Sequence, residues 1–514
     1  MPLPRFATFG GTFCAVLFFG VSGDFTPSAA SAEPSISQRV DDLLAARWKE
    51  QGVEAAAPAD DSELLRRLYL DLTGVIPTVA ESREYLQDSR PEKSRALIDR
   101  LLVSPAHSTH LADVWRDLML PRKFDPNQTA GLIGLQNWLR RQFVDNRRYD
   151  RVVADLLVAT GGDESGPALF YTAVGLKPEE LGATTARIFL GVRLDCAQCH
   201  NHPFEKWTQQ DFWGYAAFFA RLQQRSRAAA GMRLVDADSG EVFLPDSKSA
   251  VPTRYPGGAP VESPERGTRR EQLAIWMVSA DNPYLAPATV NFVWAQLFGR
   301  GLVEPLDDFG DHNPASHPRL LDELAQSFVA SGYDLRRLYR SLTNTRAYQL
   351  ASRRAGGPER PADLFAEMAV KTLSSEQLYD SLSRVALQSS AAMSQRLADP
   401  QRQAFLIKMQ TQSQTATDFE LGVPQALTLL NGTELNRAAD AAQSGLLAAL
   451  EAPFMTDGQR VEIAFLATLA REPRDSERSR FVEYVESASP DKHKEALGDV
   501  VWALVNNAEF ALNH

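Results

Sequence analysis

The chain has 514 residues, of which 44% are hydrophobic and 23% charged, and it contains 8 tryptophans and 26 phenylalanines. This composition is that of a globular protein and excludes extensive disorder, while the length predicts more than one domain. The formal net charge of -11 excludes a general affinity for phosphate backbones, so we expect no nucleic-acid partner.

The N-terminus has the three parts of a secretory signal in their usual order. Arg5 precedes an apolar run, FATFGGTFCAVLFFGV, and small and polar residues then lead to the Ala30, Ser31, Ala32 cleavage pattern. This order predicts a signal peptide over residues 1–32 and export to the periplasm or beyond. An uncleaved anchor is the alternative, although the run is short for a membrane span. After cleavage we expect no span, because no other stretch is long and apolar enough.

Residues 33–222 show mostly helical periodicity. The stretch SELLRRLYLDLTG has leucines at helical spacing between a candidate N-cap, Ser62, and a terminating Gly74. The stretches DRLLVSPAHSTHLADVWRDLML and LQNWLRRQFVDN follow the same period, and a further helix is predicted from Pro178 up to a pair of cysteines. We therefore expect an N-terminal helical domain over residues 33–222.

The motif CAQCH, at the end of that helix, contains Cys196, Cys199 and His200. Because Cys14 leaves with the signal, every cysteine of the mature chain lies in this motif, and none remains to cross-link distant loops. Two thiols one helical turn apart can add to the two vinyl groups of one haem, and the adjacent imidazole can bind its iron as the proximal ligand. Since c-type haem is attached after export, we predict one covalent haem c.

Two other uses of the motif stay open. Cys196, Cys199, His200 and His202 are four candidate ligands for a zinc ion, although structural zinc sites usually join pairs of ligands from distant segments. A redox-active dithiol is typical of a βαβ context, whereas helix and loop are predicted here.

A haem would take its second axial ligand from the face opposite His200, which the neighbouring His202 can hardly reach. The more distant candidates are His107, His110, Met232, His312 and His317. For each of them the alternative is a surface histidine or a packing methionine. A vacant sixth position would favour ligand binding or catalysis over simple electron transfer.

Residues 223–268 are rich in Arg, Ala, Ser, Gly and Pro and are predicted to be a linker. Within it, MRLVDADSGEVFLP alternates around Ser239 and Gly240, which predicts a small β-hairpin there. The helical period returns in REQLAIWMVSADNP, so residues 269–514 are the predicted C-terminal helical domain. The expected fold is thus mainly α, with two helical domains joined by a Pro/Gly-rich linker with a small β-hairpin.

The stretch VEPLDDFGDHNPASHP gathers Asp307, Asp308, Asp311, His312, Asn313 and His317 within one Gly/Pro-rich loop. Oxygen ligands at this density could hold calcium, but their spacing is not that of an EF-hand loop. We expect instead a structured turn with helix-capping aspartates.

Several long stretches, in one order, resemble a known pair of domains. FLGVRLDCAQCHNHPFEKWTQQDFWGYAAFFA resembles the signature of the planctomycete cytochrome-c-associated domain (PSCyt-type), and LLRRLYLDLTGVIPT is similar to its opening segment. LAIWMVSADNPYLAPATVNFVWAQLFGRGLVEPLDDFGDHNPASHPRLLDELA and VWALVNNAEFALNH are similar to its companion PSD-type domain. Both are known chiefly as domains of unknown function in exported proteins. The resemblance implies a c-type haem signature at Cys196, Cys199 and His200 and identifies no substrate.

Three functions are consistent with these observations. We expect an exported protein that binds one covalent haem and transfers electrons to or from a partner protein within a larger redox system. The first alternative is a non-redox structural or interaction protein whose CAQCH motif binds zinc or is merely structural. The second is a haem enzyme with an open iron position.

Overall fold

The computed structural model describes residues 35–120, 129–162, 166–201, 205–227, 231–245, 247–262, 267–352, 360–387, 393–409, 432–440 and 442–514. Contacts divide the chain between Ser35 and Ile36, and Ile36–His514 forms one compact unit. The predicted signal peptide, residues 1–32, lies outside the described residues, as does His202. None of the helices that the structure describes combines the length and the apolar character that a membrane crossing requires.

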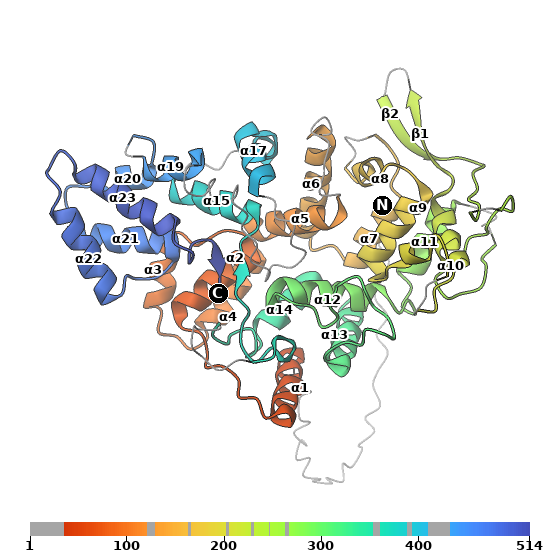
Figure 1. Ribbon diagram of the computed structural model, residues 1–514, viewed down its shortest axis with the longest axis horizontal. Helices are drawn as coiled ribbons and strands as arrows, with labels where there is room; N and C mark the ends of the chain where they lie inside the picture. The colour runs from red at the N-terminus through yellow and green to blue at the C-terminus, as the bar shows by residue number, and fades with distance from the viewer. Residues whose placement is uncertain are drawn as a thin grey trace, which may run out of the picture. The chain divides into compact units, whose positions relative to one another are not determined.

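The expectation of a mainly helical fold is confirmed (Figure 1). The helices before the linker are α1 Ile36–Gln51, α2 Asp61–Thr73, α3 Val79–Gln87, α4 Lys93–Leu102, α5 Pro105–Met119, α6 Thr129–Val144, α7 Tyr149–Leu157, α8 Ala168–Val174, α9 Pro178–Thr185 and α10 Gln209–Ala216. Short π-helical or 3₁₀ turns are η3 Ala186–Leu190, η4 Leu194–Ala197, η5 Ala217–Phe219 and η6 Ala362–Leu364. The later helices are α11 Arg269–Met277, α12 Leu285–Phe298, α13 Pro318–Ala330, α14 Leu335–Thr343, α15 Ser375–Val385, α16 Met393–Ala398, α17 Pro400–Met409, α19 Thr433–Ala439, α20 Gly445–Leu450, α21 Asp457–Leu469, α22 Asp475–Glu486 and α23 His493–Val505.

The described strands form two small antiparallel sheets, one of which is the hairpin of β1 Leu222–Arg227 and β2 Gly231–Asp236. The predicted hairpin around Gly240 is therefore wrong in position. Strand β2 contains its expected first strand, but the partner precedes β2 in the chain, and Phe243 on the other side makes only an isolated bridge. A Cβ on Gly240 would lie 2.3 Å from the Ala220 carbonyl oxygen, so this glycine serves a close backbone approach and no tight turn.

The second sheet pairs β3 Lys371–Thr372 with β4 Leu512–Asn513 (Figure 1). It brings the C-terminus beside α2, whose Arg66 donates hydrogen bonds to the carbonyls of Phe510 (2.8 Å) and Thr468 (3.1 Å). The sheet therefore closes the end of the chain onto one of its first helices.

Helix α2 has the ends that its sequence indicates, with one shift. Its N-cap is Asp60 rather than the predicted Ser62, and the Asp60 carboxylate accepts a 2.9 Å hydrogen bond from the Glu63 N–H. It ends at Gly74, as predicted, in the left-handed conformation (φ 71) with an N–H bond to the Leu70 carbonyl.

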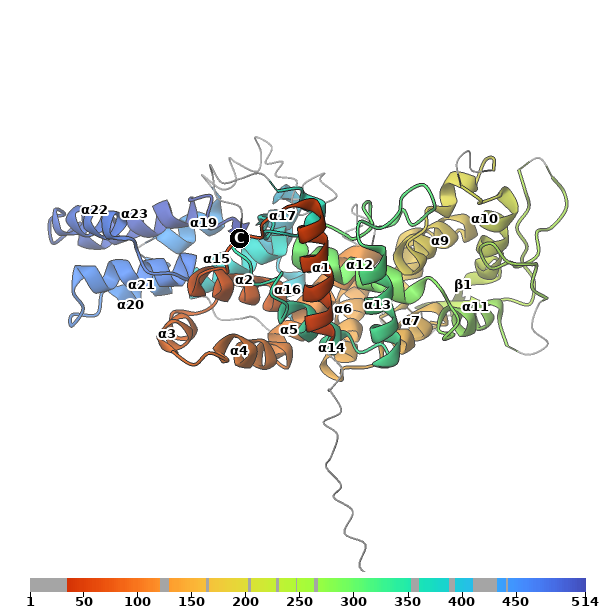
Figure 2. The same cartoon turned by 90° about the horizontal axis from the view of Figure 1, so that it is seen from below.

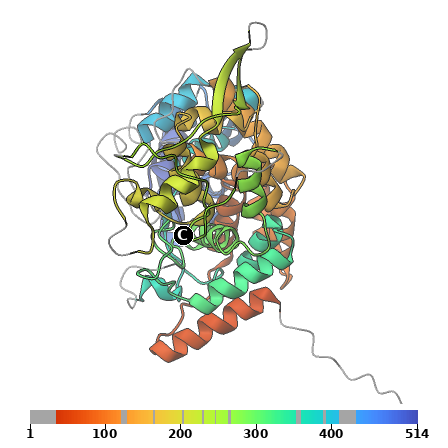
Figure 3. The ribbon, with the colours of Figure 1, turned by 90° about the vertical axis from the view of Figure 1, so that its right-hand side faces the viewer.

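One continuous set of buried apolar side chains extends from Val40 in α1 to Met368, so both sides of the predicted linker contribute to it. A second cluster combines Leu70 and Ile76 with buried residues of α15 to α23. Within that second cluster, α21, α22 and α23 pack on one another (Figure 2). Helix α1 lies along α13 (Figure 3), where Arg39 donates two hydrogen bonds to the Glu323 carboxylate. Helices from the two halves thus share their cores.

Candidate functional site

The CAQCH motif follows η3, which ends at Gly191 in a left-handed conformation (φ 67). The 3₁₀ turn η4 then carries Cys196, with its neighbours Leu194 and Ala197 fully buried. Cys196 and Cys199 are both exposed and are not joined in a disulfide. The turn is therefore anchored in the core by its apolar residues and presents two free thiols to solvent.

Helix α10 holds the backbone of the motif in place. The Gln209 side chain donates a 2.6 Å hydrogen bond to the Cys199 carbonyl, and the Trp213 indole N–H donates one of 3.1 Å to the Gln198 carbonyl. The backbone N–H of Gln209 donates to the Asn201 side chain at 3.0 Å. Since these groups have partners, residues 198–201 have a defined conformation although most of them are exposed.

The His200 imidazole is exposed, and its Nδ1 lies 2.8 Å from the carbonyl oxygen of Asn201. A carbonyl oxygen can only accept a hydrogen bond, so this contact places the ring proton on Nδ1. Nε2 then carries the lone pair and can bind a metal ion, and the Nδ1 bond orients the ring, as partners of metal-binding histidines usually do.

The structure brings the acidic loop, residues 304–313, against the segment that leads into the motif. The backbone N–H of Phe309 donates a 2.9 Å hydrogen bond to the Gly191 carbonyl. The guanidinium of Arg193 donates two hydrogen bonds, of 2.9 and 2.7 Å, to the Asp307 carboxylate. Two stretches that the sequence presents as separate features thus form one site.

The same loop also contacts the segment after the motif, through His312 and Glu205. The Glu205 side chain is only 5% exposed, and its carboxylate accepts hydrogen bonds from His312 Nδ1 and, at 3.3 Å, from the His312 backbone N–H. The hydrogen bond to Glu205 is the main cause of a raised His312 pKa. His312 Nε2 lies 3.4 Å from an Asp308 carboxylate oxygen. A Cβ on Gly310 would lie 2.5 Å from the Glu205 carboxylate, so a larger residue there would push this side chain aside.

The Cys196 thiol has a raised pKa, mainly because neighbouring atoms partly desolvate it although the residue is exposed. The carboxylates of Asp195 and Asp308 raise it further, and the cations of Arg193 and Arg187 oppose them. The thiol is therefore protonated at neutral pH.

The two candidate ligands on α5 face the end of α2. His107 is buried, its Nδ1 lies 2.7 Å from the Leu72 carbonyl, and burial lowers its pKa to about 4. His110 lies against Gly74, where a Cβ would come within 2.5 Å of its Nδ1, and burial lowers its pKa. The His107 ring also lies edge-on against Tyr339 of α14, and none of the described contacts of either ring is with η4.

The remaining candidates lie on other elements. Met232 stands on β2 opposite Ser226 in the hairpin register. His317 is buried just before α13, with its ring beside Phe365. The structure therefore brings one of the distant candidates, His312, into the contact network around CAQCH, through Glu205.

The acidic loop is a structured turn, and the part of the chain that the structure describes holds no group of three or more His, Cys, Asp or Glu side chains that could hold a metal ion. Asn313 donates hydrogen bonds to the carbonyls of Asp308 (3.0 Å) and Glu304 (3.3 Å). The expectation that its aspartates cap a helix is wrong, since α13 begins after His317 without a side-chain cap. Asp307 instead pairs with Arg193 because the two loops pack together.

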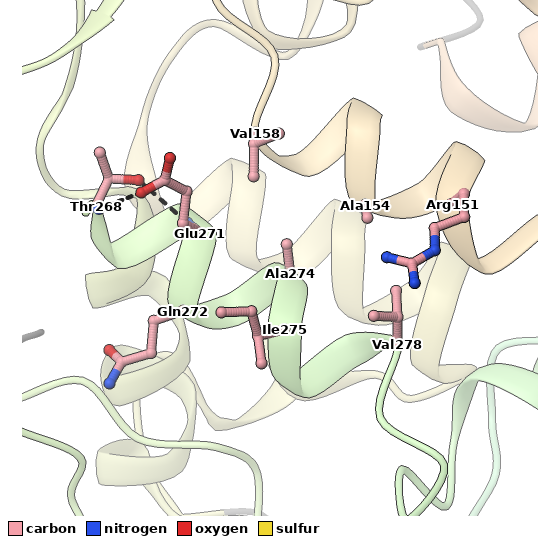
Figure 4. A pocket seen from close by; sticks show the side chains of 9 residues that line it. All are labelled: Arg151, Ala154, Val158, Thr268, Glu271, Gln272, Ala274, Ile275 and Val278. Carbon is pink, nitrogen blue, oxygen red and sulfur yellow. Dashed lines mark hydrogen bonds between the residues drawn. The ribbon is translucent and has the colours of Figure 1, made fainter. Parts of the chain in front are cut away.

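A cavity of about 400 Å³ lies elsewhere, between α7 and α11 (Figure 4). The figure shows Ala274, Ile275 and Val278 of the α11 segment along it, with Arg151 at one end. None of the predicted site residues lines this cavity.

Two families match the chain, in the order that the resemblance implies. Residues 39–224 match PSCyt2, a protein of unknown function (DUF1549), and residues 269–420 match PSD1, a protein of unknown function (DUF1553). Among curated proteins and solved structures there is no significant match. The CAQCH motif and Glu205 lie in the first matched region and His312 in the second, so both regions build the site. Glu205 was not singled out in the sequence, because a lone glutamate carries no spacing signal.

Proposed function

We propose that the protein, whose residues 39–224 match PSCyt2 and residues 269–420 match PSD1, is an exported protein that binds one covalent haem c and transfers electrons. One observation carries the proposal: two exposed thiols that form no disulfide and an exposed imidazole, whose Nδ1 is hydrogen-bonded, lie within and directly after one 3₁₀ turn. The predicted signal peptide supports export, and a partner redox protein would receive or supply the electrons.

The residues present fit this group. Each thiol, Cys196 and Cys199, would add its S–H across one vinyl group, with sulfur bonding to one carbon and the hydrogen going to the other, so the addition needs no oxidant. His200 would bind the iron through Nε2, with Nδ1 held by the Asn201 carbonyl. When bound, the haem supplies one-electron redox chemistry.

The chain around the motif would supply rigidity. Gln209 and Trp213 hold two carbonyls of the motif, so the thiols stay at a defined spacing. Arg193 and Glu205 hold the acidic loop on both sides of the motif. Rigid protein surroundings keep changes in the geometry of a redox site small when it gains or loses an electron.

The alternatives make different demands on the same residues. A tetrahedral zinc site would require Cys196, Cys199, His200 and a fourth ligand to converge within about 2.0 to 2.3 Å of one ion. A redox dithiol usually has an attacking thiol of lowered pKa, whereas the pKa of Cys196 is raised. The zinc-binding or purely structural protein is thus the second candidate.

The test is to produce the full chain with its own signal in a bacterial host that has a haem-attachment system. We expect a Soret band, a positive pyridine haemochrome assay, haem stain that survives a denaturing gel, and a mass increase of one haem. The Cys196→Ala/Cys199→Ala variant should lose all four. Matured protein with the mass of the bare polypeptide and no Soret band would refute the proposal, and stoichiometric zinc in that material would support the second candidate.

A further inference from the structure

We propose that Arg402 binds a small oxyanion, a carboxylate or a phosphate group, at a buried arginine cluster to which both family regions contribute. The arginine cluster consists of Arg116, Arg396 and Arg402, and none of these belongs to the haem site proposed above. The inference is therefore independent of haem. The burial of Arg402, its missing hydrogen bonds and the carboxylate that it shares with Arg396 carry it.

Arg402 is buried because of its position in the sequence of α17. Arg402, Phe405, Leu406 and Met409 recur at helical spacing, which places them on one face of the helix, and all four are buried. Helix α17 packs against α15 (Figure 1). The Arg402 side chain is only 1% exposed. A full positive charge thus lies on the face that α17 otherwise buries with apolar residues.

The Arg402 guanidinium makes no hydrogen bond to any residue that the structure describes. Its Nε, Nη1 and Nη2 are all buried, and all three lack an acceptor. Its neighbours are Asp380, whose Oδ1 lies 3.5 Å from Nε, and the Tyr379 ring, whose centre lies 5.8 Å from the guanidinium carbon. Charged donors buried without acceptors are among the costliest arrangements in a protein interior, and native proteins rarely keep them. The nitrogens of Arg402 therefore call for a partner beyond the described side chains.

Asp380, the carboxylate next to Arg402, already serves another arginine. Arg396 donates hydrogen bonds to both of its oxygens, from Nε at 3.2 Å and from Nη2. Two guanidinium groups thus share Asp380, which can balance the charge of only one of them. Burial lowers the pKa of Arg396, and the cations of Arg402 and Arg116 lower it further, so these charges act on one another.

The other carboxylates of the cluster are bonded to Arg116. Asp113 Oδ1 accepts hydrogen bonds from Arg116 at 2.7 Å and from Gln136 at 2.9 Å, while its Oδ2 lies 3.4 Å from Arg396 Nη2. The carboxylates of Asp117 and Glu376 also accept from Arg116, at 2.6 and 3.3 Å. None of the described hydrogen bonds joins these three carboxylates to Arg402.

An oxyanion supplies what Arg402 lacks. A carboxylate or phosphate group can accept two parallel N–H bonds from one guanidinium and brings a negative charge with them. Because Arg396 also contacts Asp113 of α5, the anion would complete a polar network that joins helices of the two matched regions. Occupancy of the site should therefore stabilise the fold.

The experiment follows thermal unfolding of the full chain as sodium phosphate, sulfate or acetate is added, with sodium chloride keeping the ionic strength equal. We expect at least one oxyanion to raise the Tm of the wild type. At a concentration 100 times its Kd, this anion should increase the folding equilibrium constant about a hundredfold. Isothermal titration calorimetry with each anion would then distinguish a preference for phosphate from one for carboxylate.

Arg402→Met removes the guanidinium and keeps a long, apolar side chain. This variant should lose the response to the oxyanion. Without added oxyanion its Tm should equal or exceed that of the wild type, because it no longer buries an unbonded charge.

The matched control is Arg460→Met. The Arg460 side chain is 12% exposed, and it donates hydrogen bonds to the carbonyls of Leu450 (2.8 Å) and Ala452 (3.1 Å). The control should have a lower Tm in every buffer and should keep the response to the oxyanion.

Arg402→Lys keeps the test decisive if the methionine variant does not fold. It should bind the anion at least about tenfold more weakly, because an ammonium group does not offer the same two parallel hydrogen bonds. The proposal is overturned if none of the three oxyanions stabilises the wild type more than chloride does. It is equally overturned if Arg402→Met or Arg402→Lys binds the oxyanion as tightly as the wild type.

Discussion

The guanidinium of Arg193 donates two hydrogen bonds to the carboxylate of Asp307, a residue 114 positions further along the chain. Arg193 lies directly before the turn that carries Cys196, and Asp307 lies in the loop that carries His312. This pair therefore connects the thiol segment of one matched family region with the acidic loop of the other.

Removing this pair should alter the site more than the stability of the protein. Both side chains are about one-third exposed, so Arg193→Ala should cost only about 0 to 1 kcal/mol of unfolding free energy. The acidic loop should become less well held, which would shift the absorbance spectrum and reduction potential of the haem that we propose at CAQCH. Thermal unfolding together with a redox titration would check this. A large loss of unfolding free energy with an unchanged reduction potential would contradict the expectation. The matched control is Arg319→Ala, which removes an ion pair with Glu323 within α13.

The close contact between Gly191 and the acidic loop gives a second prediction. A Cβ on Gly191 would lie 2.7 Å from the Phe309 ring, and the residue has a left-handed φ of 67. Gly191→Ala should therefore destabilise the protein by more than the roughly 1 to 2 kcal/mol that the conformation alone costs. Gly52→Ala is the control, because Gly52 has a similar φ of 64 and nothing within 4 Å of its added Cβ. Urea unfolding would measure the loss of unfolding free energy in both variants. Equal losses would show that the Phe309 ring moves aside at little cost.

The buried ion pair of Lys371 and Asp71 predicts a large effect on stability. Both side chains are 5% exposed and 2.7 Å apart, and Tyr348 also donates a hydrogen bond to Asp71. Lys371→Met would leave the Asp71 carboxylate buried without its cation, which usually costs about 3 to 5 kcal/mol.

The matched control for that variant is Lys494→Met, which removes an exposed pair with Glu451 and should cost less than about 1 kcal/mol. Denaturant titrations would compare the two. Similar unfolding midpoints would show that the interior pair adds little to stability.

The contact between His312 and Glu205 predicts a pH dependence in protein without haem. The hydrogen bond to Glu205 is the main cause that raises the His312 pKa above its usual 6.5, because it stabilises the charged ring. The stabilising contribution is therefore fully present below the unfolded pKa of about 6.5 and is lost as the pH rises through the folded pKa.

Nuclear magnetic resonance titration of the Cys196→Ala/Cys199→Ala protein would measure this pKa directly. Glu205→Gln should lower it towards the usual histidine value, since the neutral amide no longer favours the imidazolium. A His312 resonance that titrates at or below 6.5 in the protein with Glu205 intact would contradict the prediction.

Local spacing was sufficient to predict a good part of the protein. The leucines and Gly74 predicted α2 and its end, and the shift of the N-cap from Ser62 to Asp60 is small because both side chains can accept a backbone N–H there. The cysteine spacing predicted the thiol pair, and the structure places both thiols in solvent. The hairpin was misplaced because alternation alone does not say on which side a strand finds its partner.

The sequence by itself determined the helices, the signal-like N-terminus and the CAQCH motif, because each depends on neighbours within a few residues and on a fixed geometric period. Only the tertiary structure decided that His312 meets Glu205 and that Asp307 meets Arg193. These residues are more than a hundred positions apart, and which loops come together depends on how the shared hydrophobic core packs α12 against η3, which no local pattern encodes.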